Sequence, residues 1–67
     1  MELLITQHAR DMMTERGIEE EQIKLAIQRG AKKRQTDGYI TFYTYLSVAY
    51  KILNDGRYKI KTVMIND

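Results

Sequence analysis

The spacing of the hydrophobic positions changes near the middle of this chain. Up to Gly30 the apolar residues recur with the 3.6-residue period of a helix, and beyond it they alternate as in a strand. This order predicts an α+β fold in which two N-terminal helices pack on an antiparallel sheet of three or four strands. No proline, linker or repeat divides the 67 residues, so we expect a single domain, residues 1–67.

Both predicted helices have recognisable ends. The first begins after Thr6, whose hydroxyl can cap it, and ends at Gly17, which suits the left-handed position after a helix. Its apolar stripe comprises Ile5, Ala9, Met12 and Met13. The second helix has three glutamates at its start and ends at Gly30. Its buried stripe is predicted to comprise Ile23, Ala26 and Ile27.

Turn signals divide the second half into strands. Asp37-Gly38 and Asn54-Asp55-Gly56 are typical of hairpins. The stretch between them is too long for one strand, so we expect a break near Thr44 to Leu46, where no clear turn residue stands. Alternation in the last strand predicts one side with Tyr58, Ile60, Thr62 and Met64, and the other with Arg57, Lys59 and Lys61. We expect one sheet face to lie under the helices and the other to be free.

The charges are distributed unevenly. Residues 1–30 carry four cations and six carboxylates, a net charge of −2, whereas residues 31–67 carry seven cations and three carboxylates, a net charge of +4. A basic half favours an anionic partner such as RNA. The candidate nucleic-acid contacts are Lys32, Lys33, Arg34, Arg57, Lys59 and Lys61. The run from Lys32 to Arg34 is equally typical of a solvated sheet edge.

Five tyrosines lie in the predicted strands: Tyr39, Tyr43, Tyr45, Tyr50 and Tyr58. Most are expected to pack against neighbouring strands, although aromatic residues interleaved with lysines can also stack RNA bases.

Several classes of function are disfavoured by what the sequence lacks. It has no cysteine and one histidine, which argues against a metal site, and no motif indicates another cofactor. No apolar run is long enough to span a membrane, and no secretory signal is evident. We therefore expect a cytoplasmic protein without a membrane partner, either a monomer or a homodimer.

The first helix carries the candidate chemistry. His8, the only histidine, can act as a general base or acid, but it can equally be a half-exposed residue bonded to backbone or water. Arg16 lies on the stripe expected to face the sheet, where it either extends past the helix end or grips phosphate in a cleft. RNA cleavage without a metal ion is chemically feasible, because the ribose 2′-OH supplies the nucleophile.

The chain resembles a known family in several of these segments. His8-Ala9 and Arg16-Gly17-Ile18 carry the specific resemblance, and the strands at residues 48–51 and 60–65 are compatible with it. On these residues the chain is similar to the domain-of-unknown-function family 4258 over nearly its whole length. One departure is Met12, at a position where the family commonly has an arginine. This departure favours a weakened or non-catalytic member, unless Arg10 substitutes for the missing arginine from a different side of the helix.

The resemblance implies a fold like that of the RelE-like toxin ribonucleases, with an open sheet face that acts on RNA. Our leading hypothesis is a small RNA-directed protein that cleaves RNA as a toxin, with His8, Arg16 and Lys51 as its catalytic residues and an antitoxin-like protein as a partner. The alternative hypothesis is a non-catalytic module that binds nucleic acid or protein. A third interpretation is purely structural, with His8 and Arg16 joining helix ends to strands.

Overall fold

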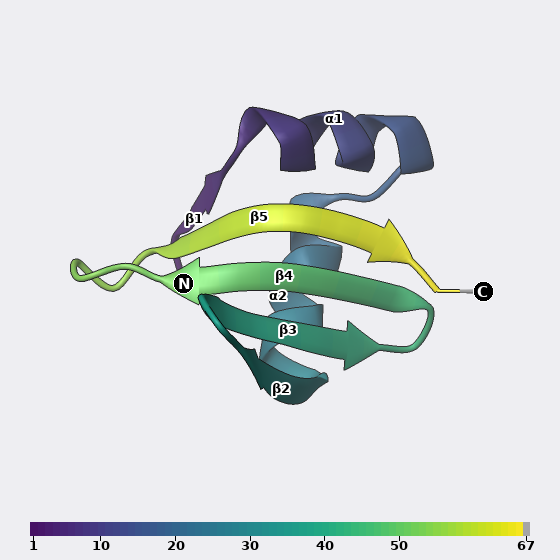
Figure 1. Cartoon of the computed structure of the whole chain (residues 1–67). Helices are drawn as coiled ribbons and strands as arrows, with labels where there is room; N and C mark the ends of the chain where they lie inside the picture. The colour runs from purple at the N-terminus through teal and green to yellow at the C-terminus, as the bar shows by residue number, and fades with distance from the viewer. Residues whose placement is uncertain (67) are drawn as a thin grey trace.

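The computed structural model describes residues 1–66 and combines two helices with five strands (Figure 1). The elements are, in chain order, β1 (Leu3–Ile5), α1 (Gln7–Arg16), α2 (Glu20–Arg29), β2 (Ala31–Gln35), β3 (Gly38–Tyr43), β4 (Leu46–Ile52) and β5 (Tyr58–Ile65). The strands form one sheet in the order β1-β5-β4-β3-β2. The predicted α+β fold is confirmed, with one strand beyond the predicted three or four. The additional strand is β1, which pairs parallel to β5 and is too short to produce an alternating pattern.

The two helices lie against different parts of the sheet. α2 crosses behind the sheet, whereas α1 lies along β5 and runs in the same direction (Figure 1). Buried side chains from both helices and from β4 and β5 form the core: Ala9, Met13, Ile18, Ile23, Ala26, Ile27, Leu46, Val48, Tyr50, Ile60 and Val63. Within residues 1–66, neither helix has the length and apolar character of a membrane span.

The predicted ends of α1 are confirmed. The Thr6 hydroxyl accepts a hydrogen bond from the Ala9 amide at 3.1 Å, and Gly17 closes the helix in the left-handed conformation with φ of 69°. Thr6 also connects α1 to β5, because its amide donates to the Ile60 carbonyl at 3.2 Å and its hydroxyl to the Lys61 carbonyl at 3.3 Å. One residue therefore fixes where α1 starts relative to β5.

α2 packs on β3 through a very close approach of their backbones. The three residues of its predicted stripe are buried, and the hydroxyl of the fully buried Thr41 donates to the Ala26 carbonyl at 2.7 Å. A Cβ atom on Gly30 would lie 2.2 Å from Thr41 Oγ1 and 2.4 Å from the Ala26 carbonyl oxygen. Gly30 is therefore required for space at this junction.

The predicted strand breaks are also confirmed. Thr36 and Asp37 form the turn from β2 to β3, and the break expected after β3 occurs at Thr44 and Tyr45. Thr44 adopts a φ of 53°, a left-handed conformation that is uncommon for threonine. Glycine or asparagine is usual in that conformation, so a threonine there gives no ordinary turn signal in the sequence.

The alternation predicted for β5 is wrong beyond Ile60. Ala49 of β4 pairs with Thr62 while Tyr50 pairs with Ile60, so Lys61 is an extra residue that forms a β-bulge. The inward side of β5 is consequently Tyr58 and Ile60 before the bulge, then Val63 and Ile65 after it. Thr62 and Met64 instead lie on the face opposite α2. We call this face the uncovered face; it also carries Ile40, Phe42, Ala49, Lys51, Lys59 and Lys61.

Replacing Gly30 with alanine tests the α2–β3 junction. The added methyl group collides with Thr41 and the helix backbone, so we expect a loss of roughly 3 kcal/mol in the free energy of unfolding. Gly17→Ala is the control, because an added Cβ meets no other atom there. The only cost is the left-handed backbone conformation of a non-glycine residue, about 1 kcal/mol. Thermal unfolding should show a drop in Tm more than twice as large for Gly30→Ala. Equal drops would contradict the close approach.

Candidate functional site

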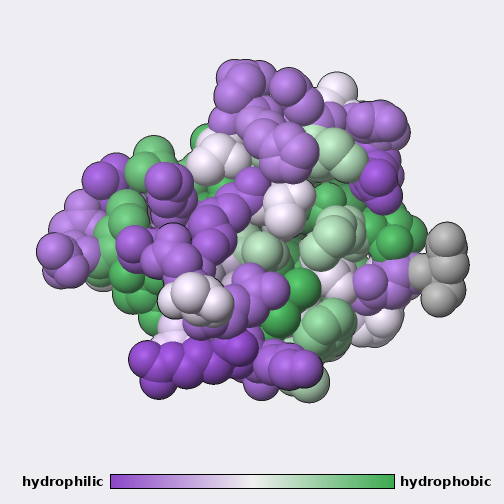
Figure 2. Space-filling model, in the orientation of Figure 1, coloured by the Kyte–Doolittle hydropathy of each residue, from purple (hydrophilic) through white to green (hydrophobic). Residues whose placement is uncertain are grey.

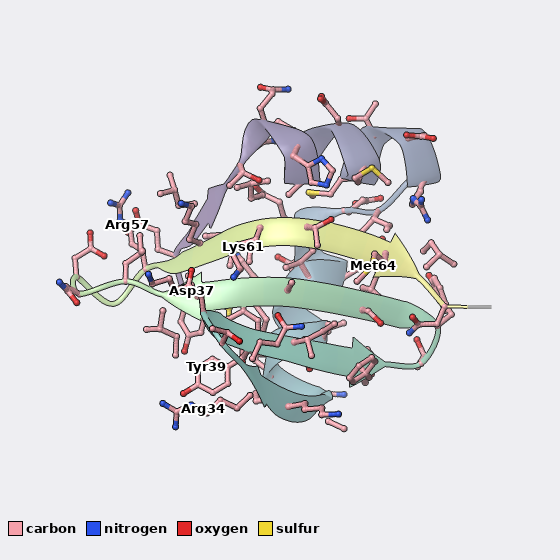
Figure 3. The ribbon with its side chains drawn as sticks, in the orientation of Figure 1. Arg34, Asp37, Tyr39, Arg57, Lys61 and Met64 are labelled. Carbon is pink, nitrogen blue, oxygen red and sulfur yellow. The ribbon has the colours of Figure 1, made fainter. Side chains whose placement is uncertain are left out.

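Three lysines gather around one carboxylate on the uncovered face. Lys51 Nζ lies 3.0 Å from Asp37 Oδ1, and Lys61 Nζ lies 3.7 Å from Asp37 Oδ2. Lys61 also donates to the main-chain carbonyl of Asp37, and Figure 3 shows these two side chains directed toward one another. Lys59 lies directly opposite Lys51 in the β4–β5 ladder. We call these four residues the lysine cluster.

The lysine cluster carries a surplus of positive charge. A hydrogen bond from Lys51 and its charge, together with the charges of Lys61 and Lys59, lower the pKa of Asp37 below its ordinary value. One carboxylate nevertheless balances only one of three ammonium groups. Like charges directly opposite each other on a sheet are destabilising. The arrangement therefore favours an external anion that can bind the remaining ammonium groups.

His8 lies on the same side of the molecule. It is the second residue of α1 and is exposed, and its Nε2 lies 3.0 Å from the Thr62 hydroxyl. The other ring nitrogen has no hydrogen-bond partner among residues 1–66 and can exchange a proton with a bound molecule. Thr62 follows Lys59 by three residues, which is about 10 Å along a strand. His8 and the lysine cluster can therefore contact one extended ligand.

Apolar residues occupy the middle of the uncovered face, at Ile40 and Ala49, and its end away from the lysine cluster, at Phe42 and Met64. Phe42 is 43% exposed and Met64 is 38% exposed, although both residues are large and hydrophobic. Figure 2 shows hydrophobic residues over the centre of the sheet, bounded by hydrophilic surface on α1 and at β2. The face thus combines an apolar centre with cations at one end.

The structure does not bring the three predicted catalytic residues together. Arg16 is the exposed last residue of α1, about 12 Å along the helix from His8. Because α1 starts beside Ile60 and Lys61 and runs along β5, Arg16 lies toward the end of that strand. Lys51 instead faces Lys59 near its start. The geometry groups His8 with the lysine cluster, and the catalytic roles themselves stay predictions.

The remaining predicted RNA contacts are spread over several surfaces. The run Lys32-Lys33-Arg34 lies in β2, the exposed edge strand. Lys33 pairs with Ile40 and shares the uncovered face, whereas Lys32 and Arg34 lie on the other side of the sheet. Arg57 lies in the loop between β4 and β5, where its Nε bonds Asp55 Oδ2 at 2.8 Å (Figure 3). Only Lys59 and Lys61 of the six belong to the lysine cluster.

Two members of this site are not among the site residues predicted from the sequence. Asp37 was recognised only as a turn residue, and Thr62 was predicted to share a side with Ile60. The spacing of the apolar residues in β5 could have revealed the bulge, because Ile60 and Val63 are three residues apart rather than two. No local signal indicates that Asp37 reaches Lys51 and Lys61, because those contacts join separate strands.

The comparisons with known proteins support the resemblance to the family expected from the sequence. A family model described as "Domain of unknown function (DUF4258)" matches residues 5–65. The chain has no significant match among curated proteins or among solved structures.

Titration of Asp37 tests the lysine cluster. Because the lysines lower its pKa, its ion pairs persist below pH 3.8, the ordinary value, and are lost only as the pH falls through the lower native value. Carboxyl-carbon NMR should therefore show Asp37 titrating below pH 3.8. Lys51→Gln should move the midpoint upward, whereas Lys24→Gln on α2 should leave it unchanged. An identical midpoint in wild type and Lys51→Gln would contradict the geometry.

Proposed function

The chain belongs to the DUF4258 family of domains of unknown function, and we propose from the geometry of its uncovered face that it binds single-stranded RNA. The observation that carries this proposal is the lysine cluster, in which Lys51 and Lys61 pair with one carboxylate and Lys59 lies opposite Lys51. Phosphates spaced along an extended strand are suited to such a row of cations, since each can bind one surplus ammonium group.

The apolar centre of the face supports RNA rather than an isolated phosphate. Single-stranded nucleic acid presents flat bases beside its charged backbone, and these bases stack on exposed aromatic rings. Phe42 is exposed on the same face as Lys51 and Lys59. In this arrangement the backbone follows the lysines while a base contacts the phenyl ring.

We further propose that bound RNA is cleaved without a metal ion. The free ring nitrogen of His8 takes the proton from a ribose 2′-OH, whose oxygen attacks the adjacent phosphorus. The bond to the 5′-oxygen breaks, water supplies that oxygen with a proton, and a 2′,3′-cyclic phosphate remains. Lys51 and Lys61 stabilise the charge that develops on the phosphoryl oxygens. Such a toxin-like activity belongs in the cytoplasm.

A second candidate function is non-catalytic binding of a protein, such as an antitoxin-like partner or a second copy of the chain. Exposed Phe42 and Met64 favour it, because large hydrophobic side chains at the surface are typical of protein interfaces. It differs from RNA binding in its weak dependence on salt.

RNA binding is tested by neutralising the cluster. We expect Lys51→Gln, Lys59→Gln and Lys61→Gln each to weaken binding of a fluorescent oligouridine and to lower the slope of log K against log salt by about 0.7. Lys24→Gln removes a charge from α2, outside the site, and should leave the slope unchanged. Fluorescence anisotropy at several salt concentrations measures both quantities. If the cluster variants bind like Lys24→Gln, the lysine cluster is not the RNA site.

Cleavage is tested separately in EDTA. Mixed RNA should be cut by wild type, and His8→Ala should slow the reaction by about 100-fold or more, because it removes the general base. Gln7→Ala, at the neighbouring exposed position, should cut normally. DNA of the same sequence should bind and remain intact, since it lacks the 2′-OH. Equal rates for wild type and His8→Ala would refute the catalytic proposal and leave RNA binding in place.

A further inference from the structure

The sheet side that faces α2 holds a second site, separate from the lysine cluster. A pocket of about 360 Å³ opens there. It lies between the C-terminal part of α2, the starts of β2, β3 and β5, and the end of β4. This volume lies within the range of small-molecule sites. Among residues 1–66 its lining contains tyrosine rings, isoleucine and methionine side chains, an amide and an ammonium group, but no carboxylate.

Three tyrosines form one wall of the pocket. The rings of Tyr39 and Tyr50 stack with their centres 5.6 Å apart, and those of Tyr50 and Tyr58 lie 5.8 Å apart. The row crosses β3, β4 and β5, so neighbouring strands hold each ring in place. A rigid aromatic wall of this kind suits a planar ligand, because little side-chain freedom is lost on binding.

The hydroxyl of Tyr50 lacks a partner in this wall. Only 2% of the surface of Tyr50 is exposed, and its hydroxyl forms no hydrogen bond with another group of residues 1–66. No buried side-chain oxygen or nitrogen of residues 1–66 lacks a partner, so this hydroxyl reaches the open pocket that Tyr50 lines and is available to a bound molecule. Burial raises the pKa of Tyr50, and the neighbouring Tyr58 and Tyr39 raise it further. Tyr50 is therefore protonated at neutral pH and acts as a donor.

The rim of the pocket is positively charged. Lys32 lines it, and the one hydrogen bond of its ammonium group is a long contact of 3.5 Å to the Gly30 carbonyl. Arg34 lies on the same side of β2 and pairs with Tyr39 in the ladder; Figure 3 shows these two residues together at the sheet edge. Neither cation forms an ion pair in the described part of the chain. An anionic group on the ligand is thus matched by free cations.

We propose that this pocket binds a mononucleotide, with its base against the tyrosine wall and its phosphate at Lys32. Ile27 and Ile52 provide apolar contacts for the faces and edges of the base. The Tyr50 hydroxyl and the Gln28 amide offer hydrogen bonds to its nitrogen and oxygen atoms. The site lies on the opposite side of the sheet from the lysine cluster and does not depend on the proposed RNA binding.

NMR of the full chain with ring-labelled tyrosine tests the proposal, using 5′-AMP as the probe. We expect saturable shifts of Tyr39, Tyr50 and Tyr58, and none of Tyr45, which lies outside the pocket. Lys32→Gln should raise the Kd for 5′-AMP about fivefold, the effect of one lost hydrogen bond, without changing that for adenosine. Lys33→Gln is the matched control, because the adjacent side chain points to the uncovered face.

Tyr50→Phe tests the contribution of the hydroxyl separately from that of the ring. It preserves the stack, and we expect it to weaken binding of both 5′-AMP and adenosine, while Tyr45→Phe should leave both unchanged. Three outcomes would overturn the proposal: no saturable shift of the three tyrosines, equal effects of Lys32→Gln and Lys33→Gln, or binding of inorganic phosphate as tight as that of 5′-AMP. Because Lys32 is exposed, the Lys32→Gln result is informative even if Tyr50→Phe unfolds the protein.

Discussion

The extra residue at Lys61 is the constraint on which the arrangement of this molecule depends. Side chains alternate between the two faces of a strand, so one inserted residue reverses the alternation of everything that follows it. In β5 the insertion keeps Ile60 and Val63 in the core although they are three residues apart. A regular strand would bury either Thr62 and Met64 or Lys59 and Lys61. The bulge instead leaves all four on the uncovered face.

The same bulge connects the fold to the site. Its carbonyls, those of Ile60 and Lys61, accept hydrogen bonds from Thr6, the residue that also caps α1. The helix therefore starts beside the bulge, and two residues later His8 reaches Thr62. The Lys61 side chain extends across β4 to Asp37 in the β2–β3 turn. A single irregularity in β5 thus brings a histidine from α1 and a carboxylate from a distant turn onto one face.

Rules that depend on neighbouring residues are sufficient to predict much of the fold, but they predict little of the site. Thr6, Gly17 and the α2 stripe could be predicted, because capping and helical periodicity depend on residues within a turn or two. The bulge was missed because simple alternation assumes an unbroken strand. The association of Asp37 with Lys51 joins a turn to another strand, and no nearby residue signals it. His8 can be identified from its chemistry, but the separation of Arg16 from Lys51 follows only from the direction of α1 along β5.

The bulge sorts the side chains of β5 so that His8 and the lysine cluster share one face, the face proposed to bind RNA. Chemical-shift mapping of isotope-labelled protein with oligouridine locates the bound RNA on the molecule. We expect the shifts to concentrate on Lys51, Lys59, Lys61 and Thr62, while Glu21 and Lys24 on the outer side of α2 remain unchanged. Shifts centred on α2, with the lysine cluster unaffected, would contradict this proposal.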